Sequence, residues 1–231
     1  MNIAIIPARA NSRRIKNKNI IEFFGKELIF YSISTAIRAK IFDEIIVSTD
    51  STKIANISKK YGAKVYFKRP RLLSENKTGL VEVIKHAIKF LEKKDKKVDI
   101  VCCILPTAPL LEESKLIEGY KLFKKKKPDF LISAVNYQLN YFRSFFSSSK
   151  KKMLKKIFPN RFNKRFYDKK IYYDAGQFYF ADKKTWLKSK STFTKKSMII
   201  EIKEELARDL NTLNDLSFLK LLYKNKKKFK N

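Results

Sequence analysis

Short apolar segments alternate with longer amphipathic segments along the first 135 residues of the chain. The apolar segments are rich in β-branched residues and lie at 2–7, 44–49, 63–67, 100–105 and 130–135. Such runs are typical of strands buried on both faces of a parallel sheet. The segments between them have helical periodicity and lie at 28–40, 51–62, 78–94 and 113–127. This alternation predicts an α/β fold with a doubly wound, mostly parallel sheet and helices on both faces.

The regular alternation ends after Val135. Residues 136–171 are rich in Tyr, Phe, Arg and Lys but show no clear period, which favours an inserted arm, with a disordered loop as the alternative. Exposed aromatic side chains call for a partner surface, so we expect this insertion to form a homodimer interface. The aromatic residues concerned are Phe142, Phe145, Phe146 and Phe166. We expect the sheet to resume at 176–180, with a strand at 198–202 and a helix at 214–223, all in one domain spanning 1–231.

The chain is strongly basic, with 53 Lys and Arg residues against 22 Asp and Glu and a formal net charge of +31. The lysines occur in clusters spread over predicted loops and helix ends, where the helix dipole favours cations. A nucleic-acid binding protein more often concentrates its charge on one face. We therefore interpret the charge as a solvated surface that also draws anionic ligands towards any cleft, and we expect no specific nucleic-acid partner.

Other features of the composition indicate a cytoplasmic protein. No apolar run approaches the roughly 20 residues of a membrane-spanning helix, and no signal peptide pattern opens the chain, so no membrane partner is expected. Cys102 and Cys103 are adjacent in a predicted strand, so their side chains should face opposite ways and form neither a disulfide framework nor a metal site. The single histidine, His86, lies in a predicted helix, where packing or surface exposure is the usual role.

The loop after the first strand carries the main candidate chemistry. It lies where α/β sheets bind ligands, at the carboxyl end of a strand, and its sequence from residue 8 to 19 is ARANSRRIKNKN. Backbone N–H groups in such a turn form an anion-binding concavity, to which Arg9, Arg13 and Lys18 would add charge. The loop has no glycine, so we expect Asn11 to adopt the left-handed conformation in its place. The glycine patterns of Walker and dinucleotide-binding loops are absent.

Several ordered motifs resemble the CMP-nonulosonic acid synthetases, the acylneuraminate cytidylyltransferases. PARANSRRIKNKN resembles the nucleotide-binding signature of that family, and FDEIIVSTD, KRP followed by LLSENKTG, and LPTAPLL resemble later segments. YYDAGQFYF is most similar to the branch that acts on pseudaminic acid. The likeness covers nearly the whole chain and implies a nucleotidyltransferase of Rossmann-like fold.

The resemblance implies that CTP and a nonulosonic acid react to give a CMP-sugar and pyrophosphate. Phosphoryl-type transfer needs mainly positioning and charge stabilisation. The resemblance accordingly assigns the catalytic roles to Arg9, Lys18 and Asp209. The residues that it places around CTP are Ala8, Arg9, Ala10, Asn11, Ser12, Arg13, Lys18, Asn19, Arg69 and Thr78. Those placed around the sugar are Leu105, Thr107, Arg143, Arg165, Asp174 and Gln177, with packing or surface roles as the alternative for Gln177 and the two arginines.

The resemblance also implies Mg²⁺ or another divalent cation. The family holds it with an Asp-x-Asp motif, and the corresponding segment here has Asp209 but Asn211 in place of the second Asp. An amide oxygen can ligate a hard cation without contributing charge, so metal binding is expected to be weaker, or assisted by Asp215. A catalytically weakened relative is therefore one alternative.

The position before the Pro-Thr turn separates the expected substrates. The sialic acid branch usually has Gln there and Arg after the turn, whereas this chain has Leu105 and Leu111. Apolar walls favour a more deoxygenated sugar, so pseudaminic acid is the predicted substrate, with sialic or legionaminic acid as the alternatives. A basic nucleic-acid binding protein is the alternative from another class, and an enzyme for the eight-carbon acid of lipopolysaccharide is disfavoured by ILPTAP.

Overall fold

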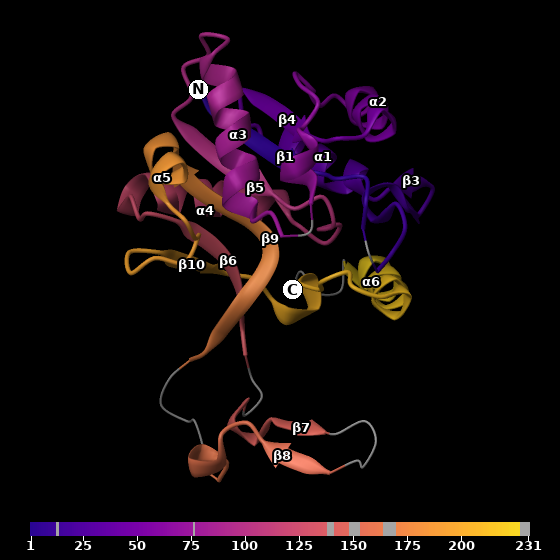
Figure 1. The fold of residues 1–231 in the computed structure, drawn as a ribbon, viewed down its shortest axis with the longest axis vertical. Helices are drawn as coiled ribbons and strands as arrows, with labels where there is room; N and C mark the ends of the chain where they lie inside the picture. The colour runs from indigo at the N-terminus through magenta and orange to yellow at the C-terminus, as the bar shows by residue number, and fades with distance from the viewer. Residues whose placement is uncertain (13, 76, 138–140, 148–152, 164–169, 227–231) are drawn as a thin grey trace.

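The protein is built on one mixed sheet of six strands in the order β10-β6-β9-β5-β1-β4 (Figure 1). The computed structural model describes residues 1–231 except 13, 76, 138–140, 148–152, 164–169 and 227–231. Neighbouring strands are parallel, except that β9 runs antiparallel to both β5 and β6. The strands are β1 (Asn2–Pro7), β4 (Glu44–Ser48), β5 (Ile100–Ile104), β6 (Leu131–Asn136), β9 (Tyr172–Asp182) and β10 (Met198–Glu201). The predicted mostly parallel α/β fold is confirmed.

Helices cover both faces of this sheet. They are α1 (Ile29–Arg38), α2 (Thr52–Lys60), α3 (Leu80–Glu92), α4 (Glu113–Lys126), α5 (Lys183–Lys188) and α6 (Leu213–Asn225). One core layer contains apolar residues of α1, α2 and α4, and the other contains those of α3 together with Trp186 of α5. Cys102 and Cys103 are both fully buried thiols, one in each layer, as the alternation of strand side chains predicts.

A third apolar cluster attaches the last helix to the beginning of the chain. Leu216, Leu219 and Leu222 of α6 pack with Tyr31 of α1 and with Phe23. Phe23 belongs to the small hairpin of β2 (Glu22–Phe23) and β3 (Lys26–Glu27). This packing holds the segment before α6 near the loop that follows β1.

The predicted strand at 63–67 is not a strand of the sheet. It runs beside β4 but makes only two isolated bridges, Ile46 with Lys64 and Thr49 with Lys68. Between the bridges Phe67 packs against the rings of His86 and Phe90 on α3. Here side-chain packing replaces continuous pairing at the sheet edge.

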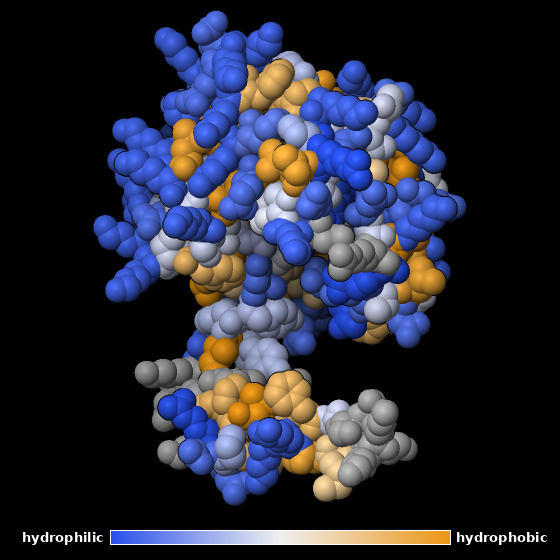
Figure 2. Space-filling view, viewed as in Figure 1, coloured by the Kyte–Doolittle hydropathy of each residue, from blue (hydrophilic) through white to orange (hydrophobic). Residues whose placement is uncertain are grey.

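The insertion after β6 forms a lobe that stands apart from the central sheet in Figures 1 and 2. Its described part contains the hairpin of β7 (Phe145–Ser147) and β8 (Leu154–Lys156) and the 3-10 helices η3 (Tyr141–Arg143) and η4 (Pro159–Arg161). Phe145 and Phe146 are 52% and 64% exposed, as predicted. The prediction was wrong for Phe142, which is buried against Phe158 and Arg161. Phe166 lies outside the described residues.

Within the described part of the chain, no helix combines the length and apolar character needed to cross a membrane. The helices instead present one apolar face to the sheet, as the sequence periodicity predicts.

The start of α6 is fixed by a capping box. The Thr212 hydroxyl accepts a hydrogen bond from the backbone N–H of Asp215, and the Asp215 carboxylate accepts from the N–H of Thr212 at 2.8 Å. The same carboxylate pairs with Arg208 at 2.8 Å. These bonds lower the pKa of Asp215 to about 2, with the hydrogen bond from the Thr212 hydroxyl the largest cause.

Replacing Asp215 tests this cap. A pKa below the ordinary value means that the carboxylate stabilises the fold above pH 3.8 and that this contribution is lost as the pH falls towards about 2. We expect Asp215→Asn to lower the free energy of unfolding by about 1 kcal/mol at pH 7. The difference from wild type should shrink between pH 4 and pH 2. Urea unfolding followed by circular dichroism measures both, with the exposed Glu205→Gln as control, and a difference independent of pH would contradict the assignment.

Candidate active site

Two loops that leave neighbouring strands enclose a basic cavity. The loop after β1 and the turn after β5 meet at the carboxyl edge of the sheet, as predicted for a ligand site. The cavity has a volume of about 450 Å³, which is within the range of small-molecule sites. It is lined by Pro7, Arg9, Ser12, Arg14, Lys18, Asn19, Leu105, Pro106 and Thr107. Six of the predicted site residues therefore line one cavity.

The first loop is held open by hydrogen bonds that leave most of its charged groups facing the cavity. The backbone N–H of Ala10 donates to Oδ1 of Asp50 at 2.8 Å. Nδ2 of the buried Asn19 donates to the carbonyl oxygen of Arg9 at 2.9 Å. Nη1 of Arg9 donates to the carbonyl oxygen of Glu75 at 2.9 Å, which ties the loop to the segment before α3. The loop is thus braced from both sides without a glycine.

The left-handed residue of this loop is Asn17, with φ of 55°, and not Asn11. Asn17 directly precedes the 3-10 helix η1 (Lys18–Ile20), and its carbonyl oxygen accepts a hydrogen bond from the N–H of Ile20. The expectation for Asn11 was wrong because the tight turn comes at the end of the loop, where the chain enters η1. Asn11 itself is exposed.

Lys18 connects this loop to the C-terminal part of the chain. Its ammonium group donates to the carbonyl oxygen of Leu210 at 2.7 Å. Burial lowers the pKa of Lys18, the nearby charges of Arg14 and Arg9 lower it further, and the carboxylate of Asp209 opposes the shift. Three cations thus gather here, and the carboxylates of Asp209 and Asp215 only partly balance them, which is an environment suited to a polyanion.

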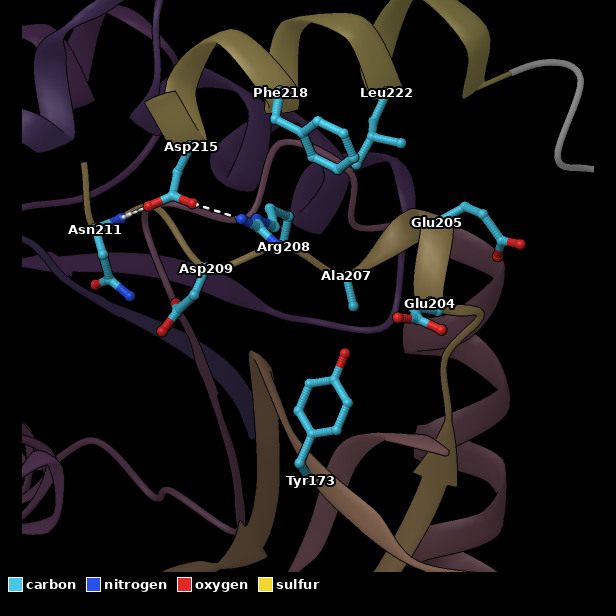
Figure 3. A pocket seen from close by; sticks show the side chains of 10 residues that line it. All are labelled: Tyr173, Glu204, Glu205, Ala207, Arg208, Asp209, Asn211, Asp215, Phe218 and Leu222. Carbon is cyan, nitrogen blue, oxygen red and sulfur yellow. Dashed lines mark hydrogen bonds and ion pairs between the residues drawn. The ribbon is translucent and has the colours of Figure 1, made fainter. Parts of the chain in front are cut away.

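A second cavity of about 530 Å³ lies on the other side of Asp209 (Figure 3). It is formed by β9, the 3-10 helix η5 (Glu204–Leu206), the segment that follows it and α6. Its lining residues are Tyr173, Glu204, Glu205, Ala207, Arg208, Asp209, Asn211, Asp215, Phe218 and Leu222. In Figure 3 the side chains of Asp209 and Asn211 point to the same side of their segment, whereas Asp215 faces Arg208.

Gly176 lies where the two cavities approach one another. Its φ is +60°, and a Cβ atom there would lie 3.4 Å from Oδ1 of Asp209 and 3.8 Å from Cδ1 of Leu105. Leu105 lines the first cavity and Asp209 lines the second. The backbone conformation favours glycine here, whereas a Cβ atom would make only ordinary van der Waals contacts with Asp209 and Leu105.

Asp174 and Gln177 of β9 have different surroundings. The exposed Asp174 accepts hydrogen bonds from the Tyr179 hydroxyl at 2.6 Å and from the N–H of Gly176 at 2.9 Å. Burial and this carboxylate raise the pKa of Tyr179. Gln177 is only 3% exposed and donates from Nε2 to the carbonyl oxygen of Leu206 at 2.5 Å, lining neither cavity. Its observed contact supports the segment before Asp209, in agreement with the packing alternative.

Arg69 is buried beside the end of β4 and lines neither cavity. Its side chain is 4% exposed, and Nε and Nη2 have no hydrogen-bond partner. Burial lowers its pKa, the carboxylate of Asp50 opposes that shift, and Arg9 adds to it. Two buried N–H groups without acceptors represent an unmet hydrogen-bonding demand that a ligand can satisfy.

The remaining predicted residues that the structure describes line neither cavity. The Ala8 side chain is in the core, and the Thr78 hydroxyl donates to the carbonyl oxygen of Leu72 at 2.8 Å. Leu111 is 1% exposed and packs in the core, so the expectation that it lines the sugar site was wrong. Arg143 is exposed on the inserted lobe. Arg13 and Arg165 lie outside the described residues.

Several residues that shape the site were missed in the sequence. Asp50 follows the carboxyl end of β4, and that position alone could have identified it. Arg14 extends the basic run of the first loop, and Arg208 precedes the candidate metal ligand. No periodic signal identifies Tyr173 or Phe218, because they line one cavity only through the tertiary packing of β9 and α6.

The donor set of Asp209 and Asn211 fits a magnesium ion that is shared with a substrate. Among the described residues no three His, Cys, Asp or Glu side chains form a metal-binding group. Mg²⁺, however, commonly binds through one or two carboxylates, substrate phosphates and water. Both oxygens of Asp215 are engaged by the helix cap and Arg208, so Asp215 is not available to assist. Asp209 and the amide oxygen of Asn211 therefore stay the candidate ligands in this segment.

Comparison with other proteins relates this geometry to known sequences. The chain is 38% identical over 225 residues to the pseudaminic acid cytidylyltransferase of Campylobacter jejuni subsp. jejuni serotype O:2, with 96% of each chain covered. It is 32% identical to a Helicobacter pylori protein named pseudaminic acid cytidylyltransferase and UDP-2,4-diacetamido-2,4,6-trideoxy-beta-L-altropyranose hydrolase, of which the match covers 40%. It is 26% identical to an Escherichia coli N-acylneuraminate cytidylyltransferase, of which it covers 50%.

The fold and a family model agree with these relatives. A solved structure of CMP:2-keto-3-deoxy-manno-octonic acid synthetase complexed with CTP superposes with a TM-score of 0.72, covering 97% of this chain and 99% of that one. At 12% identity this likeness concerns the fold alone. The model of the family described as cytidylyltransferase matches residues 3–229. The chain therefore belongs to the cytidylyltransferase family.

Proposed function

We propose that this protein transfers the CMP group of CTP to pseudaminic acid, a nonulosonic acid, and releases pyrophosphate. The observation that carries the proposal is the pair of adjoining cavities, one lined by Arg9, Arg14 and Lys18 and the other lined by Asp209, with Lys18 near the boundary. A reaction between a triphosphate and a second substrate needs this arrangement. The identity of the sugar rests on the named relatives that match nearly the whole chain.

The first cavity is suited to the triphosphate. Arg9 and Lys18 supply positive charge, and Ser12 and Asn19 supply polar groups beside them. In a low-dielectric site these fixed charges stabilise the negative charge that develops as pyrophosphate leaves. Arg69, with two unpaired guanidinium nitrogens, would bind the base end of CTP, which is remote from the reacting phosphate.

The second substrate would enter from the side of Asp174, Gly176 and Asp209. Its anomeric hydroxyl would attack the α-phosphate near the junction marked by Gly176, where Leu105 and Asp209 come close together. Leu105 provides an apolar wall, and Thr107 provides a hydroxyl on the same turn. Because Leu105 offers no hydrogen bond, it favours a sugar with fewer hydroxyl groups.

Asp209 and Asn211 would hold Mg²⁺, which would neutralise phosphate charge when bound. The carbonyl oxygen of Leu210 positions the ammonium group of Lys18, so Lys18 can bind phosphate without a metal ion. With one carboxylate in place of two, the site would have weaker metal affinity.

We further propose a homodimer formed through the inserted lobe and a cytoplasmic location. Phe145, Phe146 and Met153, which is 67% exposed, give the lobe an apolar surface suited to a second copy. Arg143 on the same lobe could then approach the partner's substrate. The two buried thiols are compatible with a reducing compartment.

Substrate choice can be measured directly. We expect pyrophosphate release from CTP and Mg²⁺ with pseudaminic acid, and a kcat/KM at least about tenfold lower with legionaminic or sialic acid. A coupled pyrophosphate assay with the three sugars gives the comparison. Preference for sialic acid would contradict the interpretation of Leu105. Absence of turnover with all three sugars would favour a weakened relative.

Two substitutions with opposite expected effects on Mg²⁺ binding test the proposed metal ligands. Asp209→Asn removes the carboxylate that we assign to the cation, so we expect kcat to fall about a hundredfold and half-saturation of the activity to require more Mg²⁺. Asn211→Asp adds a charged ligand and should lower the Mg²⁺ concentration needed. Activity against Mg²⁺ concentration reports both. Equal half-saturation in the two variants would exclude this segment as the metal site.

Leu105→Gln tests the apolar wall of the sugar site. The buried amide would lack a partner with the preferred sugar, so we expect kcat/KM for pseudaminic acid to fall about tenfold. The ratio of activity with sialic acid to activity with pseudaminic acid should rise. Leu111→Val, a core change on the same turn, serves as the control and should leave this ratio unchanged. An unchanged ratio in Leu105→Gln would remove Leu105 from the sugar site.

A further inference from the structure

Unpaired polar atoms are concentrated around the end of β4 and the neighbouring helix α3. Among the described residues, four buried side-chain atoms have no hydrogen-bond partner: Ser48 Oγ, Arg69 Nε, Arg69 Nη2 and His86 Nδ1. All three residues belong to the end of β4, the segment beside it, or α3. Buried polar atoms are nearly always paired in folded proteins, so such a concentration in one layer indicates a functional demand.

The backbone brings these residues to one side of the sheet. Ser48 follows Ile46 by two positions on β4, so its side chain faces the same layer, which contains α3. The N–H of Arg69 donates to the carbonyl oxygen of Thr49 at 2.7 Å, which fixes Arg69 next to the end of β4. On α3, the ring of His86 packs edge-on against Phe67, with centroids 4.9 Å apart. Phe67 precedes Arg69 by two residues.

The chemistry of Arg69 and His86 is complementary. A guanidinium group has only donors, whereas a neutral imidazole has one nitrogen with a free lone pair. Burial lowers the pKa of His86, and the charge of Arg69 lowers it further, so the imidazole is neutral at physiological pH. In the tautomer that carries its proton on Nε2, the buried Nδ1 has the free lone pair and can accept a hydrogen bond.

We propose that His86 is a positioning residue for CTP: its Nδ1 accepts a hydrogen bond from the Arg69 guanidinium, directly or through one water, when the nucleotide binds. This proposal rests on the proposed function, since it assigns Arg69 to the nucleotide. The bond would use one N–H of Arg69 and direct the others towards the cavity. Phe67 packs against the imidazole ring, and the negative charge of Asp50 acts on the Arg69 guanidinium.

Three substitutions at His86 separate this role from simple packing. Asn places an amide atom near the position of Nδ1, Gln places one near Nε2, and Leu fills similar space without a polar atom. We expect His86→Leu to weaken CTP binding about tenfold, as loss of a hydrogen bond to a charged group predicts. His86→Asn should restore most of the affinity, and His86→Gln should remain close to His86→Leu. The KM for the sugar should not change in any variant.

Calorimetric titration with CTP in the absence of sugar is the primary measurement, and kinetics with both substrates follow. Lys89→Leu, an exposed position on the same helix, is the matched control, and thermal unfolding checks the fold. Equal CTP affinity in wild type and His86→Leu, or equal affinity in His86→Asn and His86→Gln, would overturn the proposal. If His86→Leu does not fold, the Asn and Gln pair still decides. Wild-type protein that binds CTP but uses no nonulosonic acid would refute the proposed function without affecting this comparison.

Discussion

The hydrogen bond from Lys18 to the carbonyl oxygen of Leu210 joins the first loop of the chain to its last segment, at 2.7 Å across 192 residues. Burial of the ammonium group is unfavourable unless it is paired, and here a carbonyl oxygen and the charge of Asp209 provide the pairing. The contact requires that α6 pack against the hairpin after the first loop, through the cluster that contains Phe23 and Leu219. The first loop lines one cavity and the last segment lines the other, so this contact fixes the position of the two cavities relative to each other.

The antiparallel strand β9 provides the second constraint. It lies between β5 and β6 and carries a register shift relative to β6 that coincides with Gly176. The shift allows Asp174 to reach the Tyr179 hydroxyl while Gln177 turns inward to hold Leu206. A strand of regular pairing would place a side chain where Asp209 now approaches Gly176. The irregularity therefore makes room for the junction of the two cavities.

Charge has different consequences at the surface and in the site. Most of the net charge of +31 comes from lysines on exposed loops and helix ends, where each contributes little beyond a general attraction for anions. Within the site, the side chain of Arg9 is hydrogen-bonded to the carbonyl oxygen of Glu75, and that of Lys18 to the carbonyl oxygen of Leu210. The backbone N–H of Arg69 is hydrogen-bonded to the carbonyl oxygen of Thr49. Their fixed positions, rather than their number, can distinguish a nucleotide from other polyanions.

Sequence alone determined the architecture, because strand and helix periodicities are local. All six strands of the sheet were located, although β9 was predicted shorter than it is. The candidate phosphate loop was placed at the end of β1. The motifs also located six of the nine residues that line the first cavity, since that cavity is built from two continuous segments. Tertiary structure alone decided which of these residues are accessible. Leu111 and Gln177 are buried, Asn17 and not Asn11 makes the left-handed turn, and segment 63–67 packs on α3 without joining the sheet. Such outcomes depend on contacts between segments far apart in the chain, as does the packing of Phe67 against His86, and no local pattern encodes them.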